Sequence, residues 1–157
     1  QPLPLPWAHT HRRATLAAAP GAAATWKRRR RAQAVATFMH STAGEALAAS
    51  SKRVRNILRD AEIRGTAIDT TLLQHAAEAD LHQALEDSAV AAPLADADYA
   101  AALSRLAQLQ GPIDAFFAEV MVNADDAALK TNRLALLAAF DAACSQIADF
   151  SVLASGA

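Results

Sequence analysis

One short stretch of the chain combines side chains whose types and spacing suit phosphate recognition. Within residues 51 to 59, three cations and one amide stand at i, i+3, i+4 and i+7, so on a helix they point the same way. They are Lys52, Arg55, Asn56 and Arg59. Guanidinium groups form forked hydrogen bonds with phosphate, and an amide can bond a base edge. The stretch therefore predicts a compact nucleic-acid surface.

The same stretch also fits an ordinary solvated helix face. In that interpretation Arg59 pairs with nearby Glu62, and Arg55 pairs with a carboxylate elsewhere in the chain. Residues 27 to 31 are five consecutive cations, which would attract any polyanion but spread their charge around a whole helix. Composition alone leaves both interpretations open.

Catalysis finds little support in the sequence. His75 and His82 are seven apart, and no third ligand stands at metal spacing. There is no glycine-rich phosphate loop and no serine in a nucleophile context. The single cysteine, Cys144, follows an apolar pattern and is expected to be a small buried hydrophobe. We expect no active site and no metal site.

The net charge of -1 hides a strong asymmetry along the chain. Residues 1 to 44 contain no Asp or Glu and carry +7, residues 45 to 64 carry +2, and the remaining residues carry -10. A polyanion would be repelled by the acidic part, except where a specific side chain projects. Any such partner is therefore expected to meet the first 64 residues.

Helices must position these side chains, because the chain is rich in Ala and Leu and poor in Gly and β-branched residues. At 157 residues it is expected to form one all-α domain. Apolar periodicity and capping residues, among them Asp69 and Asp96 or Asp98, predict a bundle of about six antiparallel helices. Their expected ranges are 29–40, 43–60, 69–93, 96–111, 112–122 and 125–152.

Residues 112 to 137 carry the sharpest pattern. An apolar ladder at i, i+3, i+4, i+7 and i+8 predicts one buried helix face, formed by Ile113, Phe116, Phe117, Val120 and Met121. The polar run 123–126 then supplies a turn and the N-cap of the next helix. On that helix a lone arginine, Arg133, is expected to pair with Asp114 or another carboxylate.

Three motifs at these spacings resemble the C-terminal domain of the bacterial glycyl-tRNA synthetase β subunit, over roughly residues 29 to 153. They are Lys52-Arg53-Val54-Arg55-Asn56, Val120-Met121-Val122 and Asn132-Arg133-Leu134. That domain is similar to the helical anticodon-binding domain of arginyl-tRNA synthetases, which is named for an Asp-Ala-Leu-Arg motif. Here the related positions, 126 to 130, read Asp-Ala-Ala-Leu-Lys, with one extra residue and Lys in place of Arg.

The resemblance implies an anticodon-binding module of a cytoplasmic heterotetramer, with glycine tRNA and the synthetase α subunit as partners. It assigns ATP, glycine and Mg²⁺ chemistry to the α subunit, and so implies no cofactor on this chain. Among the site residues it implies Lys52, Arg53, Arg55 and Asn56 as RNA contacts, and helical geometry adds Arg59. The alternative is a helical interaction module that docks a partner subunit without binding nucleic acid.

Residues 1 to 28 match nothing in that family and contain Pro2, Pro4, Pro6 and Pro20, so low order is expected there. The family domain would then occupy residues 29 to 157. A frameshift or wrong start near residues 29 to 31 would produce such a sequence. An acid-free, Arg-rich leader also resembles a transit peptide, although the prolines would break its amphipathic helix.

Overall fold

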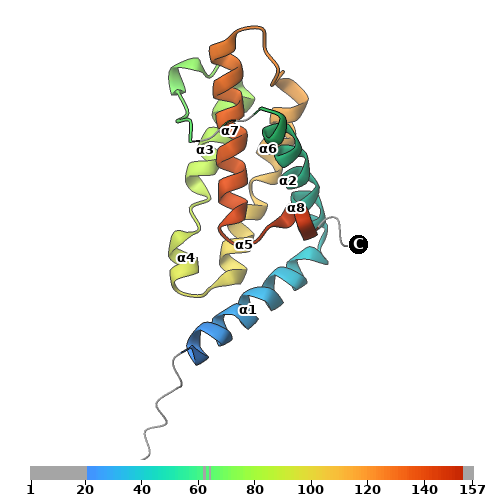
Figure 1. Cartoon of the computed structure of the whole chain (residues 1–157), viewed down its shortest axis with the longest axis vertical. Helices are drawn as coiled ribbons and strands as arrows, with labels where there is room; N and C mark the ends of the chain where they lie inside the picture. Colours follow the sequence, from blue (N-terminus) through green and yellow to red (C-terminus); the bar gives the residue numbers. More distant parts are fainter. Residues whose placement is uncertain (1–20, 62, 64, 154–157) are drawn as a thin grey trace, which may run out of the picture.

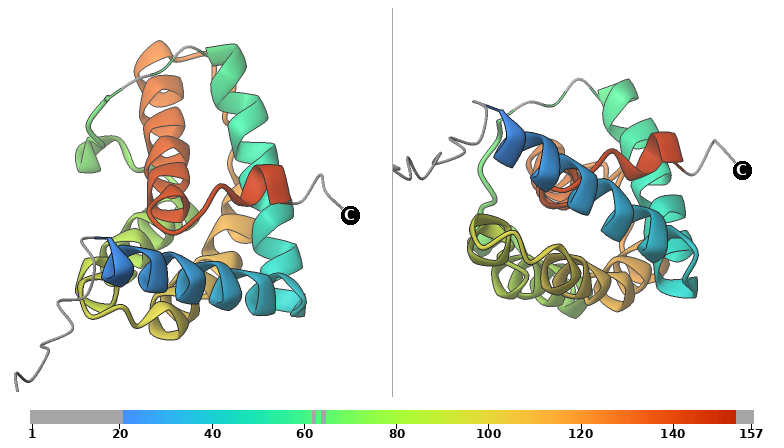
Figure 2. Two further views of the ribbon diagram at one scale, coloured as in Figure 1. Left: turned by 60° about the horizontal axis from the view of Figure 1, so that its bottom comes forward. Right: turned by 90° about the horizontal axis from the view of Figure 1, so that it is seen from below.

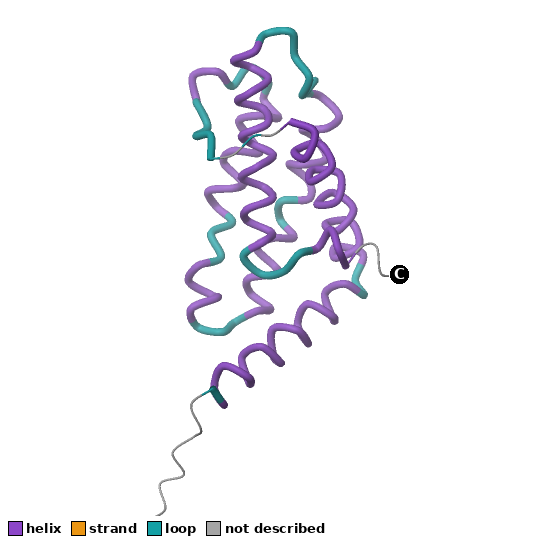
Figure 3. The backbone as a smooth tube through the Cα atoms, in the orientation of Figure 1, coloured by secondary structure: helices purple, strands orange, loops and turns teal. Residues whose placement is uncertain are grey.

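The computed structural model describes residues 21–61, 63 and 65–153, and these residues form helices joined by loops, without a strand among them (Figures 1 and 3). Six helices of nine or more residues follow the predicted order: α1 (Ala22–Met39), α2 (Thr42–Ala61), α3 (Ala76–Asp87), α5 (Tyr99–Ala107), α6 (Gln110–Glu119) and α7 (Ala127–Ser145). Two shorter elements lie between them, η1 (Thr70–Leu72) and α4 (Ala91–Ala95), and a third, α8 (Phe150–Leu153), follows α7. The predicted all-α bundle is confirmed.

The longer helices form an upright bundle with one helix laid across its lower end. Helices α2, α3, α5 with α6, and α7 run along the long axis, and α2 contacts α6 and α7 while α3 contacts the same two helices (Figure 1). Helix α1 crosses the lower end and contacts α2 and α5 (Figure 2). A continuous core fills the space between these helices. Its fully buried large side chains include Leu47, Leu81, Leu106, Ile113, Phe116, Phe140 and Phe150.

Two predicted caps start the expected helices, and a third starts a shorter element than predicted. The carboxylates of Asp98 and Asp126 accept backbone N–H groups at the starts of α5 and α7, as expected. Asp69 accepts from Thr71 N, but it caps only η1. The predicted helix 69–93 is therefore wrong at both ends, since α3 spans only Ala76–Asp87. Pro93 falls in the first turn of α4, where its missing N–H is tolerated.

Two further boundaries differ from prediction. Gly111 and Pro112 lie in the first turn of α6 rather than ending α5. The predicted helix 125–152 is interrupted, because α7 ends at Ser145 and α8 begins at Phe150.

The buried ladder also stops early, at Val120. Val120 is extended, with φ -112° and ψ 127°, so the helical period no longer applies to the next residue. Met121 is 72% exposed, and its predicted place in the buried face is wrong.

The corner between α1 and α2 depends on a glycine. A Cβ on Gly44 would lie 1.9 Å from the carbonyl oxygen of Phe38, so no side chain fits where α2 begins against the end of α1. The Ser41 hydroxyl accepts from Gly44 N at 3.1 Å and caps α2 at the same corner. Helix α1 begins at Ala22, earlier than the predicted Arg29. Residues 1 to 20 of the predicted low-order segment lie outside the described residues.

Candidate nucleic-acid interface

Helix α2 presents one polar face to solvent and buries the other in the core. Leu47, Ser51 and Val54 are buried, and Ile57 and Leu58 pack against the core from the same helix. The opposite face carries four exposed polar residues, which we call the α2 cationic face: Lys52, Arg53, Asn56 and Arg59. The core therefore holds this face in a fixed direction.

Arg55 does not point with the α2 cationic face, although its spacing predicted that it would. Its Nε donates to Asp141 Oδ1 at 2.9 Å, its Nη1 to Asp149 Oδ2 at 2.6 Å and its Nη2 to Ser145 Oγ at 3.1 Å. The hydrogen bond to Asp141 is the main reason that the pKa of Arg55 is raised. Arg55 thus joins α2 to the end of α7 and the start of α8, as the alternative interpretation of the stretch expects. Its part in RNA binding stays a prediction.

Arg53 stands at the opposite flank of α2, against α6. Its guanidinium carbon lies 3.9 Å from the centre of the Phe117 ring, which is a cation–π contact. The resemblance, rather than helical spacing, selected Arg53. Phe117 was expected only as a core residue, and its role as a platform for Arg53 depends on how α6 packs beside α2.

The middle of the α2 cationic face is open to a ligand. Within the described residues, no ion pair or side-chain hydrogen bond involves Lys52, Asn56 or Arg59. The predicted Arg59 pairing with Glu62 lies outside the described residues. Cations on a rigid helix can bind phosphates at fixed spacing, and the amide between them can reach a base or a ribose.

The basic run of residues 27 to 31 lies on α1, away from the middle of α2. Two of its arginines rest on aromatic rings, Arg30 on Trp26 at 4.8 Å and Arg31 on Tyr99 at 5.4 Å. Its side chains are exposed all round the helix. The run can therefore raise the local positive potential, but it presents no single ordered face.

A buried ion pair connects α3, α7 and the loop after α6. Arg133 Nε donates to Glu78 Oε1 at 2.7 Å, and Arg133 Nη1 donates to the carbonyl oxygen of Met121 at 2.8 Å. Glu78 Oε2 accepts from the backbone N–H groups of Gln74 and His75. Burial alone would raise the pKa of Glu78, but these hydrogen bonds and Arg133 outweigh it, and the pKa is lowered. The predicted pairing of Arg133 with a carboxylate is confirmed, with Glu78 as the partner.

The remaining candidate groups are structural or isolated. Asn132 exchanges two hydrogen bonds with the backbone of Asp69, at 2.7 and 3.0 Å. Cys144 is buried, and burial raises the pKa of its thiol to about 12. In the part of the chain that the structure describes, no group of His, Cys, Asp and Glu is arranged to hold a metal ion. None of the helices described there is long and apolar enough to cross a membrane.

Comparison with known proteins gives a consistent result. Residues 47 to 149 match the DALR anticodon binding domain. Glycine-tRNA ligase beta subunits are similar over about 80% of this chain: that of Dechloromonas aromatica is 47% identical over 132 residues, that of Pseudomonas aeruginosa 49% over 126 and that of Aeromonas salmonicida 53% over 129. The matched part spans only 18% of the length of each of these relatives. The chain therefore belongs to the DALR anticodon binding domain family.

Proposed function

We propose that this chain is a tRNA-binding module whose α2 cationic face meets the anticodon stem and loop of glycine tRNA. The observation that supports this most directly is the row of exposed cations and one amide along α2, backed by the core. Its residues are available to a ligand, whereas the buried Arg133 is already committed to Glu78. Family membership and the names of the relatives favour tRNA over other polyanions.

Each side chain has a distinct proposed role. Lys52 and Arg59 bind phosphates, and Asn56 between them bonds a base edge or a ribose hydroxyl. The guanidinium of Arg53 lies over the Phe117 ring, and its N–H groups are proposed to donate to the RNA. Arg55 contacts RNA only by exchanging a carboxylate for a phosphate, because its guanidinium already has three partners.

The larger assembly is also part of the proposal. The relatives are beta subunits, so we infer an α subunit partner in a heterotetramer and a supporting role in glycyl-tRNA aminoacylation. ATP and Mg²⁺ would act on that partner and not on this chain. The expected cellular compartment is the cytoplasm, where tRNA charging takes place.

One observation favours a second function, docking of a partner subunit. A cavity of about 590 Å³ lies between α1 and α8, and its lining is mostly apolar. Val152 and Leu153, which line it, are exposed. A partner seated there would bury apolar surface, so its affinity would respond little to salt.

Salt dependence separates the two functions. Fluorescence anisotropy would measure binding of glycine tRNA and of an anticodon-swapped tRNA at two salt concentrations. Each phosphate contact contributes about 0.7 to 0.9 to the slope of log affinity against log salt. The double variant Lys52→Ala/Arg59→Ala should lose two such contributions. The matched variant Lys27→Ala/Arg29→Ala removes two cations from α1 and should change the slope less.

Three outcomes decide the matter. A wild-type slope near zero would favour docking and contradict the tRNA proposal. An unchanged slope in the Lys52→Ala/Arg59→Ala variant would remove the α2 cationic face from the interface. Equal affinity for both tRNAs would keep tRNA binding and contradict reading of the anticodon.

A further inference from the structure

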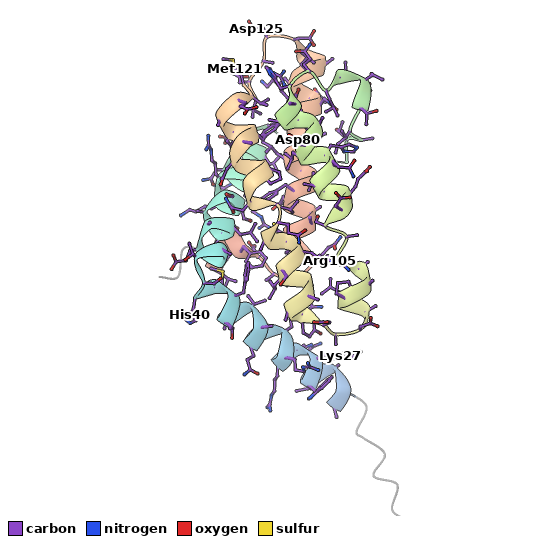
Figure 4. All side chains as sticks on the ribbon, turned by 180° about the vertical axis from the view of Figure 1, so that it is seen from behind. Lys27, His40, Asp80, Arg105, Met121 and Asp125 are labelled. Atoms are coloured by element: carbon purple, nitrogen blue, oxygen red, sulfur yellow. The ribbon has the colours of Figure 1, made fainter. Side chains whose placement is uncertain are left out.

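A hollow of about 410 Å³ lies where the last turn of α2 meets the loop after α6 and the first turns of α7. Ile57, Val122 and Leu134 form its apolar lining, and Asp60, Asn123 and Lys130 form its polar lining. Its volume falls in the range of small-ligand sites, about 300 to 1,000 Å³. Met121 and Asp125, from the same loop, lie at the end of the molecule opposite Lys27 (Figure 4).

The lining matches the surface of a nucleobase. A base has two flat apolar faces, and its edge carries both donors and acceptors. The aliphatic side chains can pack against a face. At the polar side, Asp60 can only accept when ionised, Lys130 can only donate, and Asn123 can do both. These three groups can together satisfy an edge that carries an amino or imino group beside a carbonyl or ring nitrogen.

Charge at this end favours a base over a phosphate. Asp60 lines the hollow, and exposed Asp125 stands in the same loop as Asn123. Two carboxylates against the single cation Lys130 leave this end negative, which opposes a phosphate, whereas an uncharged base does not feel this repulsion. The phosphate-binding groups begin one residue away, since Arg59 directly precedes Asp60 on α2. A backbone held by the α2 cationic face would therefore bring its bases toward the hollow.

The loop that forms one wall is held in place before any ligand arrives. The buried Arg133 donates to the carbonyl oxygen of Met121, and Ala124 N donates to the carbonyl oxygen of Val122 at 2.9 Å. Asp126 then caps α7. Sites whose backbone is fixed by buried contacts bind with less ordering cost. The loop also leaves the apolar side chain of Met121 in solvent, next in sequence to Val122.

We propose that this hollow receives one unstacked nucleobase of the anticodon loop, with Asp60, Asn123 and Lys130 bonding its edge. Exposed Met121 provides an apolar surface for an adjacent base. This inference rests on the proposed function, because the α2 cationic face must first bring the RNA to the hollow. It adds a base-reading site that is separate from the phosphate contacts.

Abasic RNA tests the inference directly. Anisotropy would measure binding of the glycine tRNA anticodon stem-loop, both intact and with a single abasic site at each loop position in turn. For the wild-type chain, one abasic site should cost about tenfold in affinity, the size expected from one lost set of base contacts. Asn123→Ala/Lys130→Ala should lose a similar factor on the intact RNA. Both residues are exposed, so thermal melting should show an intact fold.

The two losses should not add. On the RNA that lacks the accommodated base, the double variant and the wild type should bind equally, because the variant has no contact left to lose. Lys27→Ala is the matched control for charge, since it removes a lysine at the opposite end of the molecule (Figure 4). It should weaken all the RNAs by one common factor.

The result that overturns the inference differs from the one that overturns the proposed function. If Asn123→Ala/Lys130→Ala weakens every RNA equally or none at all, the hollow holds no base, although tRNA binding survives. If the wild-type chain does not bind the intact stem-loop in a salt-dependent way, the proposed function itself fails.

Discussion

Arg133 and Arg55 each join distant parts of the chain through carboxylates, but they do so at different depths. The Arg133 side chain is 5% exposed and that of its partner Glu78 is fully buried. The Arg55 side chain is 33% exposed, and those of Asp141 and Asp149 are 26% and 41% exposed. The first cluster fixes the loop after α6, and the second ties α2 to α7 and α8.

This difference in depth separates a fixed contact from an exchangeable one. Removing one partner of a buried pair leaves a charge without compensation, which costs about 3 to 5 kcal/mol. An exposed pair is screened by water and salt, and contributes about 0 to 1 kcal/mol. Arg133 is therefore committed to structure, whereas Arg55 can change partners at little cost. Only an exposed arginine such as Arg55 is suited to a ligand that binds reversibly.

The largest effect is expected from Arg133→Ala. The change leaves Glu78 buried without its cation and frees the carbonyl of Met121, so the free energy of unfolding should fall by about 3 to 5 kcal/mol. Urea unfolding followed by circular dichroism would measure it. Arg29→Ala, an exposed arginine on α1, is the matched control and should stay within about 0.5 kcal/mol of wild type. A loss below about 1 kcal/mol in Arg133→Ala would show that the buried pair is not fixed.

A smaller and pH-dependent effect is expected at Glu78. Because its pKa is lowered in the folded state, its contribution is complete above the unfolded-state value of about 4.3 and is lost as the pH falls through the folded-state value. Glu78→Gln should therefore show a weaker loss of stability between about pH 7 and about pH 3 than wild type does. Asp69 and Asp149 also have lowered pKa values, so they should contribute to the acid sensitivity of the Glu78→Gln variant. Identical pH profiles would contradict this assignment.

The smallest loss in the free energy of unfolding is expected from Arg55→Ala, at about 1 kcal/mol or less. Local opening around α7 and α8 should increase more, and the rate at which Cys144 is labelled can measure it. Its thiol is buried, with a pKa raised to about 12, so a thiol reagent should label it slowly at neutral pH. Losing the contacts to Asp141 and Asp149 should loosen α8 and speed labelling by more than the global change explains. An unchanged labelling rate would mean that Arg55 does not hold α7 and α8 together.

Local signals made most of the fold predictable. The periodic apolar residues and the caps Asp98 and Asp126 act within one or two helical turns, and the structure confirms the six longer helices that they predict. Asp69 shows the limit of such signals, because a cap does not say how long the capped element is. Met121 shows another limit, because the spacing of buried residues follows the helical period only as far as the helix continues.

The candidate site was less predictable, because its geometry depends on partners far away in the sequence. Arg55 lies 86 residues from Asp141, and Arg133 lies 55 residues from Glu78. Spacing on one helix places Arg55 near Lys52 and Arg59, but it cannot show which neighbouring helix offers a carboxylate. The hollow at Asn123 and Lys130 is likewise formed by three separate segments, and no local pattern marks it.

Because Gly44 has no Cβ, a substitution there can change where the cations of α1 lie relative to α2. A methyl group added at Gly44 would collide with the Phe38 carbonyl, so the corner between α1 and α2 would have to shift. The five cations of residues 27 to 31 all lie on α1, so a shift at this corner would change their position while the total charge stayed the same. Gly44→Ala is therefore a way to test the placement of these cations apart from their number, because the substitution changes the corner and leaves the charge of the chain unchanged.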